Sequence, residues 1–167
     1  MNASGFGTFV PFGTIPTATL FLDHAPGGVA DTAILFKIED GGSVRIFDRS
    51  LIEKRQPTPA LSVHQIAADK HVIALDGYGI EIERSIDNVL WETDADFVKA
   101  AVIADDEGRL FLKAYRNRRK DDYVCVLFDL ETGEVANLAR ATVGFRRWSI
   151  VSRTARGERI ELFRFGN

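Results

Sequence analysis

Short runs of alternating apolar and polar residues recur along the chain, as expected for half-buried β-strands. Clear examples are residues 44–49, 80–83 and 160–165. Segments rich in Gly and Asp separate such runs, and Gly permits positive φ while Asp accepts hydrogen bonds from the turn backbone. These turn segments are 40–43, 76–79, 106–108, 131–133 and 156–157. The pattern predicts an all-β fold, an antiparallel meander in a single domain spanning residues 1–167.

Two segments have a mixed pattern. Residues 94–103 contain enough apolar positions for two helical turns, with Asp94 as the N-cap. Their β-branched end, followed by an acidic turn at 105–108, suits a strand entering a hairpin equally well, and we expect a strand. Residues 62–69 are too short for a convincing helix and are also expected to be extended.

The strands recur with a period of about 38 residues, within the range that is typical of repeat architectures. Units of an apolar strand, a turn and a second strand begin near Ala33, His71, Arg109 and Trp148, at nearly equal intervals. A further apolar strand precedes most of them, at 19–22, 62–67, 97–103 and 142–145. About four strands per period of roughly 40 residues is typical of β-propeller blades.

This repeat predicts a small β-propeller-like ring, in which residues 8–12 supply the strand that the last unit lacks. Closure would remove the exposed strand edges that an all-β chain has to protect. Hairpins of ordinary length also produce such a spacing, so a β-barrel or a β-sandwich is the alternative.

The net charge of −3 conceals a strong asymmetry along the chain. Residues 1–108 hold 8 basic and 17 acidic side chains, a balance of −9, whereas residues 109–167 hold 13 and 7, a balance of +6. Hydrophobic residues at 46% and charged residues at 27% are average for globular proteins and exclude long disorder. The sequence therefore predicts one compact body with an acidic and a basic sector.

The number of cysteines and the hydropathy of the chain indicate the cellular compartment of the protein. Cys125 is the only cysteine, so no intramolecular disulfide can form, and its apolar surroundings predict an inert thiol in a buried strand. No stretch approaches the roughly 18 apolar residues of a membrane helix, and the N-terminus lacks a basic segment before its apolar residues. We expect a cytoplasmic protein without a membrane partner.

No catalytic motif is present. The chain lacks Gly-x-Ser-x-Gly, His-Glu-x-x-His and a phosphate-binding P-loop, and its cysteine has no nearby histidine. His64 and His71 could face each other across a hairpin, but a zinc site needs further ligands that the sequence does not offer. We therefore expect neither a metal, nor a cofactor, nor enzymatic activity.

Acidic side chains cluster beside aromatic residues in the first two-thirds of the chain. An aromatic anchor among acids is suited to a protein interface with a basic partner. The predicted partner-binding residues are Trp91, Glu92, Asp94, Asp96, Asp105, Asp106 and Glu107. The leading hypothesis is a non-enzymatic protein-binding module, most concretely an immunity-type protein that neutralises a basic toxic enzyme.

Basic and aromatic residues are interleaved in the C-terminal third, a composition typical of nucleic-acid grooves. This predicts an alternative basic patch of Arg116, Arg118, Arg119, Lys120, Arg146, Arg147 and Trp148. The second hypothesis is therefore a small-ligand or nucleic-acid binder, although a sequence pI near 5.6 disfavours a polyanion outside a confined patch.

Overall fold

The computed structural model describes residues 2–3, 7–24, 32–48, 61–120, 122–137 and 141–166. Within these ranges the chain forms strands and short 3-10 helices and no α-helix, which confirms the all-β prediction. The strands are β1 (Asn2–Ala3), β2 (Gly7–Pro11), β3 (Leu20–His24), β4 (Thr32–Lys37), β5 (Gly42–Asp48), β6 (Ser62–Gln65), β7 (His71–Ala74), β8 (Gly79–Ile82), β9 (Val89–Trp91), β10 (Val102–Asp105), β11 (Leu110–Arg119), β12 (Asp122–Asp129), β13 (Val135–Ala136), β14 (Ala141–Phe145), β15 (Trp148–Arg153) and β16 (Arg159–Phe165). The 3-10 helices are η1 (Phe12–Thr14), η2 (Ile86–Asn88) and η3 (Ala95–Lys99).

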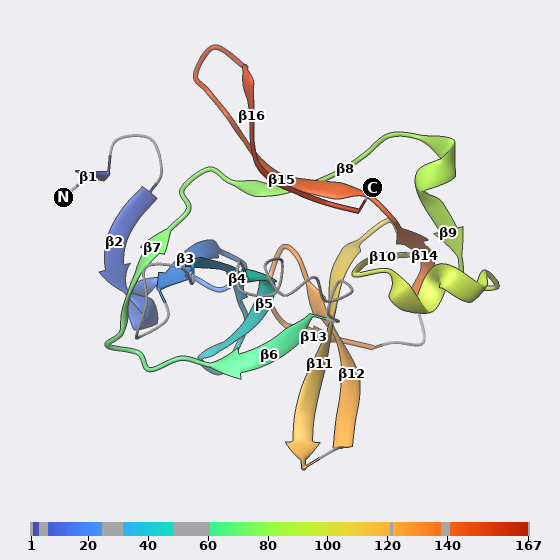
Figure 1. The fold of residues 1–167 in the computed structure, drawn as a ribbon, viewed down its shortest axis with the longest axis horizontal. Helices are drawn as coiled ribbons and strands as arrows, with labels where there is room; N and C mark the ends of the chain where they lie inside the picture. Colours follow the sequence, from blue (N-terminus) through green and yellow to red (C-terminus); the bar gives the residue numbers. More distant parts are fainter. Residues whose placement is uncertain are drawn as a thin grey trace.

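The described strands form one large and one small sheet (Figure 1). The large sheet has the order β1-β2-β7-β3-β4-β5-β6-β11-β10-β14-β9, with β12 beside β11 and β13 beside β12. The small sheet has the order β16-β15-β8. Strands β6 and β11 meet through a single parallel bridge between Ser62 and Tyr115, which divides the large sheet into two parts. The strands thus form an N-terminal group (β1–β7), a central group (β9–β14) and a C-terminal group (β8, β15 and β16).

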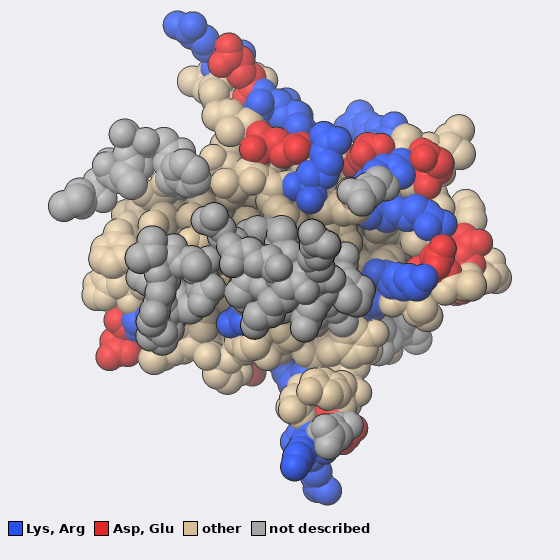
Figure 2. Space-filling view, in the orientation of Figure 1, with Lys and Arg blue, Asp and Glu red and all other residues tan. Residues whose placement is uncertain are grey.

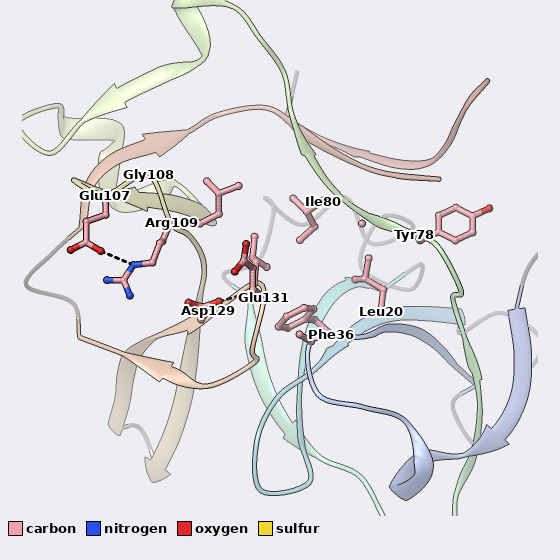
Figure 3. A pocket seen from close by; sticks show the side chains of 13 residues that line it. Leu20, Phe36, Tyr78, Ile80, Glu107, Gly108, Arg109, Asp129 and Glu131 are labelled. Carbon is pink, nitrogen blue, oxygen red and sulfur yellow. Dashed lines mark hydrogen bonds and ion pairs between the residues drawn. The ribbon is translucent and has the colours of Figure 1, made fainter. Parts of the chain in front are cut away.

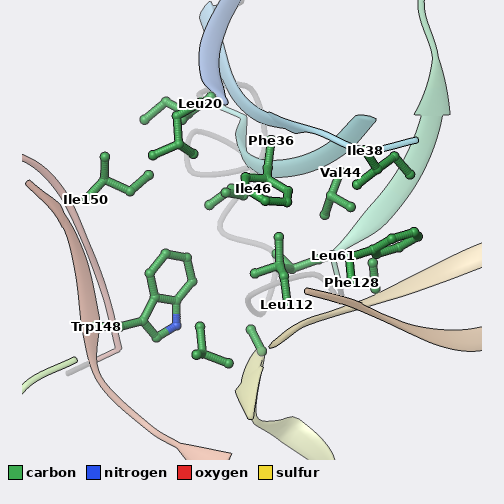
Figure 4. Close-up of a cluster of buried hydrophobic side chains, with 14 of the residues drawn as sticks. Leu20, Phe36, Ile38, Val44, Ile46, Leu61, Leu112, Phe128, Trp148 and Ile150 are labelled. Carbon is green, nitrogen blue, oxygen red and sulfur yellow. The ribbon is translucent and has the colours of Figure 1, made fainter. Parts of the chain in front are cut away.

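The main hydrophobic core is assembled from all three groups. Phe36 of β4, Leu112 of β11, and Trp148 and Ile150 of β15 are buried in one cluster (Figure 4). Smaller clusters lie within the N-terminal group, around Phe21, and within the central group. Burial of apolar area is the main favourable term in folding, so the packing of the three groups on this core positions the surface loops between them.

The predicted repeat is present in the strand positions but only partly in the strand pairing. Strands β4, β7, β11 and β15 begin within one residue of the predicted unit starts. The hairpins β4–β5, β11–β12 and β15–β16 form as predicted, whereas β7 pairs with β2 and β3, and β8 pairs with β15. The described strands therefore do not divide into four blades.

The ring closure predicted for the N-terminal strand is wrong. Strand β2 pairs with β1 and β7, not with the last unit. The large sheet ends at β1 and β9, so the described strands do not form a closed barrel. The alternation of residues 8–12 is compatible with many neighbouring strands, so it could not predict that β2 pairs with β7.

The strand predicted for residues 97–103 is also wrong in its first half. Residues 95–99 form the 3-10 helix η3, and the strand starts only at Val102. The helix lays the Phe97 ring over Gly144, where a Cβ atom would come within 3.2 Å of that ring. A glycine on the neighbouring strand β14 thus makes room for a helical turn that the local pattern alone does not require.

Two buried lysines, Lys37 and Lys113, occupy matching positions in the units that begin near Ala33 and Arg109. Lys37 lies at the end of β4, the first strand of unit one, and Lys113 lies within β11, the first strand of unit three. The Lys37 Nζ donates hydrogen bonds to the backbone oxygens of Phe12 (2.9 Å), the first residue of η1, and of Ile15, which follows η1. The Lys113 Nζ donates to the backbone oxygen of Val98 in η3. Burial lowers the pKa of both ammonium groups from the usual value.

Candidate functional site

The two predicted acidic segments lie at the same end of the central group. Strands β9 and β10 both run antiparallel to β14, so their C-terminal ends lie together at the start of β14 (Figure 1). Trp91 and Ala104 are both in register with Val143, and Asp105 is in register with Ala141. The turns that follow β9 and β10 carry the predicted acids and therefore occupy one edge of the molecule.

An apolar row crosses one face of the sheet at this edge. Trp91, Val143, Ala104 and Leu110 are successive cross-strand partners, and the N–H of Leu130 donates to the oxygen of Leu110 at 3.0 Å. Directly opposite residues of antiparallel strands share a face, with Cβ atoms about 5 Å apart. The row begins at Trp91, whose side chain is 60% exposed, and passes inward to Leu110 and Leu130, which pack on the main core.

Hydrogen bonds and ion pairs within the chain engage Asp94, Asp96 and Asp105. Asp105 is buried, and its Oδ1 accepts the N–H groups of Glu107 (3.0 Å) and Arg109 (2.9 Å), while its Oδ2 pairs with the Arg109 guanidinium. Asp94 accepts the Trp91 N–H at 2.8 Å, and so fixes the turn after β9. Asp96 forms ion pairs with Lys99 (2.9 Å) and with Arg146.

These bonds also lower the pKa values of two of the carboxyl groups. The hydrogen bond from Lys99, followed by that from Arg146, lowers the pKa of Asp96. Burial opposes ionisation of Asp105, but the hydrogen bonds from Arg109 and Glu107 and the charge of Arg109 together outweigh it, so the pKa of this carboxyl is lowered. The side chains of Glu92, Asp106 and Glu107 are exposed, and Glu107 also pairs with Arg109 at 3.5 Å.

The apolar row leads into a cleft of about 370 Å³ between the three strand groups (Figure 3). Its floor is apolar, made by Leu20, Phe36, Ile80, Leu110 and Leu130. Its rim is charged and comes from the turns after β10 and β12, with Glu107, Arg109, Asp129 and Glu131. Of these lining residues, Glu107 alone belongs to the predicted partner-binding residues.

The predicted basic patch is divided by the fold. Arg118, Arg119 and Lys120 are exposed at the tip of the β11–β12 hairpin, which projects from the body (Figures 1 and 2). Arg116 is half-buried on the same hairpin, with its guanidinium carbon 5.9 Å from the centre of the Phe128 ring. This hairpin tip, which also carries the exposed Tyr123, is the described part of the patch that projects into solvent.

The other half of the patch lies elsewhere and is engaged. By strand register Arg146 lies level with residue 113 of β11, so the hairpin tip is about 20 Å further along the strand. Arg147 pairs with Glu83 and Asp87, both at 2.9 Å, and its hydrogen bonds to these carboxylates raise its pKa. Trp148 is fully buried in the core. The structure therefore does not bring the seven predicted residues together.

A ladder of ion pairs covers one face of the C-terminal group. Glu81 of β8 pairs with Arg153 (2.9 Å) and Arg159 (2.8 Å), and Glu161 of β16 pairs with Arg159 (2.9 Å) and Arg164 (3.2 Å). The charges are visible over the upper part of the space-filling view (Figure 2). The basic sector is thus largely neutralised where it meets β8, a strand from the acidic part of the sequence.

This ladder predicts an acid-sensitive contribution to stability. Hydrogen bonds from Arg164 and Arg159 lower the pKa of Glu161 from 4.5 to about 2. A carboxyl whose pKa is lower in the folded state stabilises the fold above its unfolded pKa, and that contribution is lost as the pH falls from 4.5 towards 2. We expect Glu161→Gln to lose less stability than the wild type over this range in urea titrations. Glu158→Gln is the control, because Glu158 is an exposed acid in the adjacent turn. The prediction would be contradicted if Glu161→Gln lost as much unfolding free energy as the wild type between pH 4.5 and pH 2.

The two histidines do not form a site together. His64 lies on β6, where its Nε2 is 2.7 Å from the Ser62 Oγ, and His71 lies on β7, where its ring contacts that of Phe9. Strands β3, β4 and β5 separate β6 from β7, so the hypothesis that the two rings face each other across a hairpin is wrong. Within the described ranges no three His, Cys, Asp or Glu side chains come together as metal ligands.

Cys125 lies in β12 opposite Tyr115, as the sequence predicts for a strand residue, but it is only half-buried. Burial raises the pKa of its thiol. A raised pKa keeps the thiol protonated and unreactive at neutral pH. Cys125 therefore takes no part in the candidate site.

Comparison with protein-family models, curated proteins and solved structures finds no match. In the described part of the chain, no helix has the length and apolar character needed to cross a membrane. The function is therefore argued from the geometry of the acidic edge, the apolar row and the cleft.

Proposed function

We propose that the chain is a non-enzymatic module that binds a basic partner protein through the edge formed by the ends of β9 and β10. In its most concrete form it is a cytoplasmic immunity-type protein that neutralises a basic toxic enzyme. The single observation that carries the proposal is the exposed Trp91 at the start of an apolar row whose flanking turns hold carboxylates.

The chemistry of this edge supports a protein partner. An aromatic side chain surrounded by polar groups is the usual anchor of a protein interface, and truncating such an anchor costs about 2 kcal/mol or more of binding free energy. Glu92, Asp106 and Glu107 are exposed around the row and would attract a basic surface and speed its association. The same acids would repel the phosphates of a nucleic acid or of an anionic membrane.

The internal bonds of the site also favour recognition without rearrangement. Asp94 holds the backbone at Trp91, and Asp105 holds the turn that carries Asp106 and Glu107. A surface that is already ordered loses little conformational entropy on binding. In the proposed function these two aspartates are positioning residues, and the partner contacts Trp91 and the exposed acids.

The test is affinity capture from the cytosol of the source organism with a tagged chain. We expect the wild type to retain one basic protein in stoichiometric amount, and Trp91→Ala to reduce its affinity at least about 30-fold. Tyr123→Ala is the matched control, because Tyr123 is 62% exposed on the remote hairpin. The captured protein, expressed alone, should arrest growth, and co-expression of the wild type should restore it.

Two results would contradict the proposal. Capture that is equally strong for Trp91→Ala and the wild type would show that the edge is not the interface. Capture that disappears after nuclease treatment or after Arg118→Glu with Arg119→Glu, but survives Trp91→Ala, would favour the nucleic-acid hypothesis. Nucleic-acid binding would in addition weaken steeply as salt rises, because counterions are released.

A further inference from the structure

We propose that the cleft beside the acidic edge receives an arginine or lysine side chain of the basic partner, an inference that rests on the proposed function. The cleft measures about 370 Å³, within the range of sites that enclose a small group. It combines an apolar floor with a rim of three carboxylates and one guanidinium. A long aliphatic stem that ends in a positive charge matches both features.

The floor suits the stem of the side chain. Leu20 and Phe36 come from the N-terminal group, Ile80 from the C-terminal group and Leu110 and Leu130 from the central group (Figure 3). Lysine and arginine bury their methylene stems along apolar surface while the charged end stays in a polar environment. The apolar floor is thus complementary to the stem.

The rim suits the charged end. The Asp129 Oδ1 accepts the N–H groups of Glu131 (2.7 Å) and Thr132 (3.2 Å), which fixes the carboxylate. Glu131 is exposed at the same turn, and Glu107 lines the cleft from the turn after β10, where its carboxylate pairs with Arg109 (Figure 3). Among the described lining residues the cation is Arg109, which pairs with Asp105 at 2.9 Å and with Glu107 at 3.5 Å, so its charge is offset and the rim, which also holds Asp129 and Glu131, is acidic overall.

One partner can reach both the cleft and Trp91. Leu110 lines the cleft and is three cross-strand steps from Trp91 through Ala104 and Val143. Three steps of about 5 Å place the aromatic anchor about 15 Å from the cleft, well within the width of an ordinary protein interface. The inferred side chain therefore enters next to the anchor and not at a separate site.

The first experiment uses matched small probes. N-acetyl-arginine methylamide carries the guanidinium, and N-acetyl-citrulline methylamide has nearly the same shape without the charge. In NMR titrations we expect the arginine probe to shift the amide signals of Gly79, Gly108 and Leu130 with millimolar affinity, and the citrulline probe to bind at least about 3-fold more weakly. Equal binding of the two probes, shifts confined to other residues, or no shifts would overturn the inference.

The second experiment removes one rim charge in the complex with the captured partner. Glu131→Gln should weaken partner binding about 3- to 10-fold, with the loss largest at low salt. Glu134→Gln is the matched control, since Glu134 is an exposed acid of the same turn that does not line the cleft. Equal affinity of Glu131→Gln and Glu134→Gln would overturn the inference.

The two proposals fail in different ways. If Trp91→Ala abolishes capture while the arginine probe does not enter the cleft, the cleft inference is wrong and the proposed function stands. If the arginine probe enters the cleft but no basic protein is captured, the proposed function is wrong, and with it the assignment of the cleft to a partner's side chain.

Discussion

Replacing Asn88 by alanine is expected to lower the free energy of unfolding by about 3 kcal/mol or more. The Asn88 side chain is fully buried, and its Nδ2 donates to the backbone oxygens of Glu83 and Arg147, both at 2.8 Å. Its Oδ1 accepts the N–H of Arg147 at 2.5 Å. Truncation removes three hydrogen bonds, each worth about 1 kcal/mol, and leaves the Arg147 N–H without this partner. The oxygens of Glu83 and Arg147 keep the bonds from the N–H groups of Ser85 (3.1 Å) and Glu83 (3.3 Å). An unsatisfied buried donor costs about a further 1–3 kcal/mol. Urea denaturation followed by far-ultraviolet circular dichroism measures the loss.

Two further variants separate the hydrogen bonds from side-chain volume. Asn88→Asp keeps the shape but places a carboxylate oxygen against two backbone oxygens, so it should be strongly destabilised at neutral pH. Such a carboxyl has a higher pKa in the folded state, and the variant should regain stability as the pH falls. Asn117→Ala, at an exposed position of β11, should change stability little. An Asn88→Ala protein as stable as Asn117→Ala would contradict the expectation.

The same residue connects stability to the candidate site. Asn88 closes η2 immediately before β9, the edge strand that carries Trp91. Its bonds tie this segment to the connection between β14 and β15. Loss of Asn88 should therefore also weaken partner binding, through the position of Trp91.

Local pattern was sufficient to predict most strands and turns. The Asp-Gly turn between β4 and β5 is one such case, with φ of 57° at Asp40 and 70° at Gly41, the positive values that a tight hairpin of this kind needs. Lys37 and Lys113 occupy matching positions of two predicted units, and the Nζ of each donates to a backbone oxygen. Each lysine satisfies the carbonyl oxygens of a preceding 3-10 helix, a contact that no alternation pattern encodes.

The choice of strand partners could not be predicted in this way. Residues 79–82 have the same alternation whether they pair with β7, as the hairpin prediction required, or with β15, as they do. Side-chain alternation specifies which face is buried and leaves the neighbouring strand open. We attribute the choice of neighbouring strand to the packing of Trp148 and Ile150 in the shared core, which places β15 beside β8.

The candidate site was predictable to the extent that its residues are close in sequence. Trp91 and its neighbouring acids could be predicted because they are contiguous, whereas Glu131 is predicted only as an ordinary turn residue and Asp129 has no predicted role in binding. They join Glu107 only because β11 pairs with both β10 and β12. Conversely, Asp105 is predicted to belong to the partner surface, although its carboxylate is bound to Arg109. These bonds depend on the geometry of the turn, which the composition does not reveal.

Replacing Trp148 by alanine is expected to cost about 3–5 kcal/mol of unfolding free energy, the largest effect of any substitution considered. The side chain is fully buried where the three strand groups meet (Figure 4). Its ring stacks on that of Phe165, with 4.9 Å between the two ring centroids. Its truncation leaves a cavity in the cluster that it shares with Leu112 of β11 and Phe36 of β4, so strands from more than one group lose buried contacts.

Trp148→Phe should lower the free energy of unfolding much less than expected from the lost side-chain volume alone. Within the described structure the indole Nε1 is buried without a hydrogen-bond partner, and phenylalanine removes this unsatisfied donor while keeping an aromatic ring for Phe165. Urea denaturation should therefore place Trp148→Phe well above Trp148→Ala in stability; equal losses would show that Nε1 has a partner in solution. Because Trp91 is then the single tryptophan, a shift of its emission on binding the partner would report directly on the proposed interface.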